Sequence, residues 1–151
     1  AFIPAIPELM DTYAQECHKL GKTPAPAERM GPVFLHIAED PDRAWHAIAP
    51  HALHETNAYG RWMNESMGDQ AVYTQMDDAD QLRASGAYQV VTPEQCIAIA
   101  NTLGPGGRLA FNPLMGGMDP ALGWESLELL KNKVIPELDI EKPAIVGQHQ
   151  A

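Results

Sequence analysis

The stretch RLAFNPLMGGMDPALGWESL, residues 108–127, contains the clearest change of local structure in the chain. Its apolar start over 108–112 is typical of a strand, and Asn112-Pro113 ends it because proline cannot donate to a strand ladder. Asp119-Pro120 predicts the start of a helix, with aspartate as the N-cap and proline in the first turn. A strand followed at once by a helix favours an α/β architecture.

Two adjacent glycines, Gly116 and Gly117, separate this strand from the helix. Glycine lets the backbone approach a flat or anionic ligand closely, and N–H groups near a helix start can hold negative charge. A tight turn that needs a positive φ is the simpler explanation of the pair. Its spacing matches neither a dinucleotide-binding motif nor a P-loop.

The rest of the chain repeats the strand-then-helix order. Residues 32–39, PVFLHIAE, form a near-continuous apolar run, as expected of a strand covered on both faces. Asp40-Pro41 and Thr92-Pro93 each predict a helix start, and Pro50 is expected to kink or split the long helical region that contains it. Further helices are expected at 7–20 and 78–86, a brief extended piece at 87–91, and a last helix with Trp124, Leu127, Leu130 and Val134 facing inward.

Only two strands are convincing, and two parallel strands alone would leave both edges open. A (β/α)8 barrel needs about 250 residues, more than this 151-residue chain has. We therefore expect residues 1–138 to form a helix-rich α/β part of a larger TIM barrel, or to find strand partners in another copy. Residues 139–151 show no periodicity and are expected to be an irregular tail.

The composition restricts which kinds of partner the chain can bind. The net charge is −10, so binding to nucleic acid or to an anionic membrane surface is disfavoured. No apolar run approaches the roughly 20 residues that a membrane span needs. The two cysteines, Cys17 and Cys96, fall on apolar helix faces and far apart, which favours a reducing cytoplasm over a secreted, disulfide-linked protein.

The segment FNPLMGGMDPALGWESLELLKNKVIPEL, residues 111–138, resembles the C-terminal end of luciferase-like flavin-dependent monooxygenases. VFLHIAEDPDRAW (33–45), ASGAYQVVTPEQCIAIANTLGPGG (84–107) and AFIPAIPELMDTYAQECHKLG (1–21) are similar to earlier segments of that family. The resemblance implies the C-terminal part of a (β/α)8 barrel that uses reduced FMN or a deazaflavin. It also implies a small-molecule substrate, O₂ as co-substrate, and a homodimer.

Carried over by position, Asn112, Pro113, Leu114, Gly116 and Gly117 correspond to the loop after the final strand, which lies near the flavin in the family. His36 and Glu39 lie near the end of the other strand, where no family motif assigns chemistry. A packed or hydrogen-bonded histidine is the simpler interpretation of His36. No catalytic residue is predicted.

A second group of polar residues is His46, His51, His54 and Glu55. The spacing of His51 and His54 places them on one helix face, but HALHE is not HExxH and a catalytic zinc needs about three protein ligands. A polar helix surface is the better interpretation, and no metal site is predicted. The function hypotheses are thus a segment of a flavin-dependent monooxygenase, inactive alone, a non-catalytic self-associating interaction module, and, third, a histidine-dependent metal hydrolase.

Overall fold

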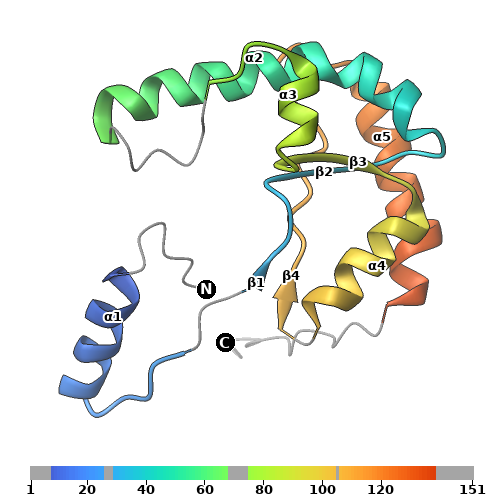
Figure 1. Ribbon diagram of the computed structural model, residues 1–151. Helices are drawn as coiled ribbons and strands as arrows, with labels where there is room; N and C mark the ends of the chain where they lie inside the picture. The colour runs from blue at the N-terminus through green and yellow to red at the C-terminus, as the bar shows by residue number, and fades with distance from the viewer. Residues whose placement is uncertain (1–7, 26–28, 68–74, 105, 139–151) are drawn as a thin grey trace, which may run out of the picture.

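The computed structural model of the protein describes residues 8–25, 29–67, 75–104 and 106–138 (Figure 1). Its elements in chain order are α1 (Glu8–Lys19), β1 (Arg29–Met30), β2 (Phe34–Ile37), α2 (Pro41–Met67), α3 (Ala79–Ala84), β3 (Tyr88–Val91), α4 (Pro93–Leu103), β4 (Gly107–Arg108) and α5 (Pro120–Leu129), which continues into a π turn (Leu130–Val134) and a 3-10 turn (Ile135–Glu137). The domain predicted over 1–138 stays a prediction. The tail expected over 139–151 lies outside the described residues.

Two pairs of parallel strands organise the described residues. β2 pairs with β3 in a register that joins Phe34 to Tyr88 and Ile37 to Val91, and β1 pairs with β4. The strand expected within 32–39 is confirmed, and its partner is the 87–91 segment, expected only as an extended piece. The strand expected over 108–112 is wrong in extent, because pairing stops at Arg108. Leu109 and Phe111 instead pack beside a buried cluster.

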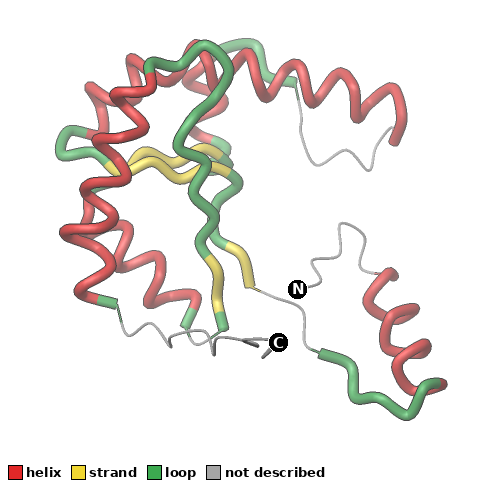
Figure 2. The backbone as a smooth tube through the Cα atoms, turned by 180° about the vertical axis from the view of Figure 1, so that it is seen from behind, coloured by secondary structure: helices red, strands yellow, loops and turns green. Residues whose placement is uncertain are grey.

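The two faces of β2 belong to two apolar clusters, since successive side chains of a strand point to opposite faces. Phe34 packs with the α2 residues Trp45, Ile48, Ala49 and Ala52 and with Leu82 of α3. Leu35 and Ile37 pack with Cys96 of α4 and with Val134 after α5. Helices therefore cover both faces of the short sheet (Figures 1 and 2). The expected helix-rich α/β class with few parallel strands is confirmed, and the strands of the described residues do not close into a ring.

The long helix α2 runs through Pro50 as one helix, so of the kink or split expected there the split is wrong. Proline removes one helical hydrogen bond, which usually kinks or ends a helix. Here Ile48 and Ala52, on either side of the proline, are fully buried, while Pro50 itself is exposed. Packing of the buried face holds α2 as one helix across the missing bond.

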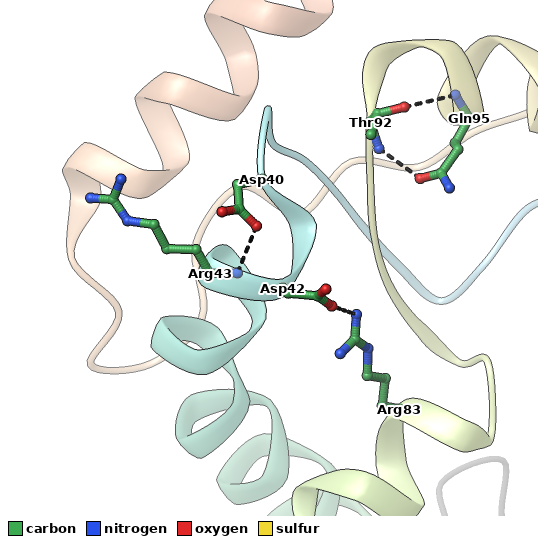
Figure 3. A network of polar contacts seen from close by, with 6 residues as sticks. All are labelled: Asp40, Asp42, Arg43, Arg83, Thr92 and Gln95. Atoms are coloured by element: carbon green, nitrogen blue, oxygen red, sulfur yellow. Dashed lines mark hydrogen bonds and ion pairs between the residues drawn. The ribbon is translucent and has the colours of Figure 1, made fainter.

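The predicted helix starts are confirmed by their caps (Figure 3). Asp40 Oδ1 accepts the Arg43 N–H at 3.1 Å at the start of α2. At α4, Thr92 and Gln95 form a reciprocal capping box, with bonds of 3.3 and 2.9 Å. Each cap satisfies donors that the first turn of a helix leaves unpaired. The Asp40 cap fixes where β2 ends and α2 begins.

A residue of α3, Arg83, also contacts the first turn of α2. Arg83 of α3 donates to Asp42 at 2.5 Å, and its guanidinium lies 5.8 Å from the centre of the Trp45 ring. In Figure 3 the Arg43 side chain extends away from this pair, on the opposite side of the α2 start. The contacts of Arg83 thus fix one side of the first turn of α2. The Arg43 side chain lies on the opposite side of that turn.

The first helix lies apart from the rest. α1 matches the helix expected at 7–20, yet none of its residues is buried, and Leu20 beside it is 69% exposed. Figures 1 and 2 both show α1 away from the sheet. In the part of the chain that the structure describes, no helix combines the length and apolar character that a membrane crossing requires.

Candidate ligand-binding site

The two adjacent glycines form a bend that packs on α2. The φ of Gly117 is +82°, and a Cβ there would lie 3.2 Å from His51 Nδ1. That nitrogen lies 3.2 Å from the Gly116 carbonyl oxygen, which accepts when Nδ1 carries the proton. A Cβ on Gly116, by contrast, would meet no atom within 4 Å. Gly117 is therefore required by the turn, whereas Gly116 faces open space.

The other predicted site residues precede this bend. Asn112 is exposed, Pro113 is partly buried, and Leu114 is 47% exposed. A Cβ on Gly123 of α5 would come within 2.6 Å of the Pro113 carbonyl oxygen. Because Gly123 has no side chain, α5 can approach the backbone of residues 113–114 closely. The structure brings Asn112, Pro113, Leu114, Gly116 and Gly117 together as one continuous segment.

A cavity of about 1000 Å³ lies elsewhere, between the carboxyl end of β2, the first turns of α2, and α5 with its π turn. None of the five residues above lines it. The apolar residues that border it are Ala38, Ala44, Ala47, Leu122 and Leu129, together with Ile37, whose own side chain is fully buried. The volume is at the upper end of the range found for small-molecule sites. In α/β proteins ligands bind at the carboxyl ends of strands. Applied to the strand predicted within 32–39, this rule indicates the end of β2, where the cavity lies.

His36 is the buried polar group of the cavity wall. The residue is 2% exposed, and its ring stacks on Phe34 with centroids 6.3 Å apart. Its Nδ1 has no hydrogen-bond partner among the described residues. Burial lowers the pKa of His36 to about 4, because a charged imidazolium is poorly solvated there. The imidazole is therefore neutral at neutral pH, and its Nδ1 is both buried and unpaired among the described residues.

Charged side chains surround the cavity: Glu39, Asp40, Glu125 and Glu128 are acidic, and Arg43 and Lys133 are basic. Lys133 donates to Glu39 at 2.5 Å, which joins the end of β2 to the π turn and raises the pKa of Lys133. Glu128 accepts from Asn132 at 2.9 Å. Four carboxylates against two cations make the surroundings of the cavity acidic.

Trp124 lines this cavity and is 66% exposed, so the prediction that it faces inward is wrong. The inward face of α5 carries Gly123 and Ser126, which are three residues apart and share one side of the helix. Trp124 is rotated away from that side. An exposed indole next to a cavity is a ready stacking surface for a ring.

The histidines of α2 do not converge. His46 and His54 are exposed, and His51 contacts the Gly116 carbonyl. Nowhere in the described ranges do three His, Cys, Asp or Glu residues come close enough together to hold a metal ion.

Comparison with protein-family models, with curated proteins and with solved structures gives no significant match. The function is therefore inferred from the residues of the bend and of the cavity.

Proposed function

We propose that the chain is the C-terminal segment of a cytoplasmic flavin-dependent monooxygenase of the luciferase-like class, whose complete form is a (β/α)8 barrel. The observation that carries the proposal is the parallel β2–β3 pair, joined through α2 and α3, with a large cavity at the carboxyl end of β2. Enzymes built from such units place their active sites at that end of the strands. The intact enzyme would act on a small molecule with O₂ and pair as a homodimer.

The bend over 112–117 supplies the surface for the flavin. Gly116 has open space where a side chain would lie, and Leu114 is half exposed, so a flat ring could lie against this backbone. The segment 109–122 contains no Lys or Arg, so it offers no cation to a phosphate. These residues fit the ring system of FMN or a deazaflavin, and the phosphate would be held by other parts of the enzyme.

A bound flavin supplies the redox chemistry itself. The residues of this segment would orient the ring and exclude water from one of its faces. Leu114 contributes apolar surface, and Gly116 permits close approach of the backbone. No group of the bend carries a proton to or from the reacting atoms.

The test is binding of flavin to the chain, alone and co-expressed with the barrel half that the proposal requires. Fluorescence of FMN and of lumichrome, which has the ring system without ribityl phosphate, should be quenched. Both should bind the segment alone with similar affinity. Gly116→Ala should weaken binding, whereas Gly21→Ala, remote from the bend, should not. Absence of quenching by the co-expressed barrel would refute the proposal.

A non-catalytic self-associating module is the second candidate, and one observation favours it. Leu9 and Leu20 expose large apolar side chains on and beside α1, a helix with no buried residues. Exposed apolar surface of this kind promotes association. Sedimentation velocity of the wild type and of Leu9→Glu/Leu20→Glu tests it: self-association that the double variant abolishes, without any flavin binding, would favour this candidate.

A further inference from the structure

One edge of the β2–β3 sheet is open in the part of the chain that the structure describes. The carbonyls of Ala87 and Val91 accept N–H groups from the β2 segment, so these groups of β3 point toward β2. Backbone groups alternate along a strand, so the N–H and C=O groups of Tyr88 and Val90 point away from β2. No described strand pairs with that side of β3.

The β3 edge lacks the residues that usually keep strand edges apart. Exposed edges are commonly protected by charged side chains or by proline. β3 reads YQVV and contains neither. On the other side of the sheet, Ser126 accepts the Ile37 N–H at 2.8 Å and so occupies the β2 edge. The β3 edge is therefore the one suited to pairing with another strand.

A groove of about 390 Å³ lies along this edge, so a strand has room to approach. Besides β3, it is lined by Arg83 and Gly86 on one side and by Gln95 and Ile99 of α4 on the other. Arg83 alone among the lining residues carries a charge, although the chain has a net charge of −10. The carboxylates that would repel a second copy are thus absent from the groove lining.

β3 is complementary to β3 of a second copy in one antiparallel register that uses all 4 residues of the strand. With the two-fold axis at Gln89, Tyr88 lies opposite the partner's Val90, and each such pair exchanges both of its backbone hydrogen bonds. Gln89 then lies opposite the partner's Gln89, with Cβ atoms about 4.5–5.5 Å apart. A two-fold contact of this kind closes after two copies, so it produces a dimer and not a fibre.

The charges at the two ends of β3 favour the same arrangement. In an antiparallel pair, the start of one strand lies beside the end of the other. Arg83 precedes β3 and Glu94 follows it, and both side chains are exposed, so each Arg83 comes near the partner's Glu94. Asp42 binds one nitrogen of Arg83, and a guanidinium has five N–H donors, so Arg83 has donors for a second carboxylate.

We propose that the β3 edge is an interface between two copies of the chain, which pair β3 with β3 antiparallel about Gln89 and form one continuous sheet. This surface shares no residue with the bend over 112–117, so the proposal does not depend on flavin binding. In a complete barrel a further strand would occupy the edge. The pairing therefore concerns the chain by itself.

Sedimentation velocity over a range of concentrations tests the association. The wild-type chain should form a dimer below about 1 mM. Because each copy has a net charge of −10, the dimer should be tighter in about 0.5 M salt, which screens the repulsion between the copies. A chain that stays monomeric up to about 1 mM at both salt concentrations would overturn the proposal.

Gln89→Lys and Gln89→Glu test the register. Each variant alone places like charges opposite each other across the axis, so each should dimerise about fivefold more weakly than the wild type. An equimolar mixture places lysine opposite glutamate and should restore the dimer. Association through α1 does not involve residue 89 and predicts no such restoration. A mixture that associates no better than the separate variants would refute the interface.

Glu94→Lys tests the charge contact, and it still decides if a Gln89 variant proves unfolded by circular dichroism. The change acts at both ends of the symmetric contact and should weaken the dimer about fivefold. Glu65→Lys is the matched control, because Glu65 is an exposed residue of α2 that does not line the groove. It alters the net charge equally and should not weaken the dimer. Equal dissociation constants for the two variants would contradict the interface.

Discussion

The Ser126 hydroxyl oxygen accepts the backbone N–H of Ile37 at 2.8 Å, across 89 residues of sequence. Both residues are buried. In a parallel pair, alternate N–H groups point to opposite edges, and the Phe34 N–H donates to the Ala87 carbonyl on the β3 side. The N–H of Ile37 points to the other edge, so Ser126 takes the place of a neighbouring strand and fastens α5 to β2.

Ser126→Ala should destabilise the protein by about 1–3 kcal/mol, because it leaves the buried Ile37 N–H without an acceptor. Urea unfolding followed by circular dichroism measures the change. Ser66→Ala is the control, because Ser66 is exposed and its hydroxyl donates only to carbonyls of its own helix. Equal unfolding midpoints for the two variants would contradict the role of Ser126.

The two glycines of the bend should respond differently to alanine. Gly117→Ala imposes a side chain at φ +82° and places Cβ 3.2 Å from His51, so it should cost about 1–2 kcal/mol of stability. Gly116→Ala meets open space and should change stability by under about 0.5 kcal/mol. Thermal unfolding of both variants measures the difference, and the reverse order would show that the bend has another geometry.

His36 should make stability depend on pH in the acid range. Its pKa is about 4 in the folded protein and about 6.5 when exposed, so the unfolded chain binds the proton first. The free energy of unfolding should therefore fall by up to about 3 kcal/mol as the pH decreases from 6.5 to 4.

The measurement is the urea unfolding free energy of the wild type and of His36→Phe at pH 7, 6, 5 and 4. Carboxylates titrate in both proteins, so the difference between the two curves isolates His36. The variant should lose less stability than the wild type between pH 6.5 and 4. Parallel curves would mean that His36 is solvated or paired in the folded protein.

Cys96 should react with thiol reagents only when the protein opens. It is fully buried, and burial raises the pKa of its thiol to about 11, so little thiolate forms at pH 8. In a Cys17→Ser variant, Ellman's reagent should show no fast reaction until denaturant is added. Cys96→Ser is the control, and Cys17, which is partly exposed, should react in its native state. A fast native reaction of Cys96 would indicate that α4 separates readily from the sheet.

The sequence predicted the elements whose signals are local. Apolar run 32–39 contains β2, and the Asp-Pro and Thr-Pro pairs mark the starts of α2, α4 and α5, because caps depend on adjacent residues. The pairing of β3 could not be predicted in this way. YQVV is four residues long, and it becomes a strand because β2 lies beside it.

Packing also overrides local signals at two other places. Pro50 should break a helix by its own chemistry, and the buried residues on either side of it keep α2 continuous. Trp124 is predicted to face inward together with Leu127, Leu130 and Val134, but Gly123 and Ser126 determine which side of α5 faces the sheet. The cavity lies at the end of a predicted strand, yet its partly acidic and partly aromatic surroundings follow only from the placement of α5 on β2.

The bond between Ser126 and Ile37 also affects how the chain folds as it is synthesised. The strand partner of β2 lies more than fifty residues downstream, and among the described residues α5 closes its other edge. Contacts so distant in sequence form slowly, because a long loop must close first. On the ribosome, β2 emerges as an apolar strand with two open edges. β3 can close one edge once residue 91 has been translated, and the other edge stays open until residue 126 has been translated. Chaperone binding during synthesis should therefore be strongest between the emergence of β2 and that of α5.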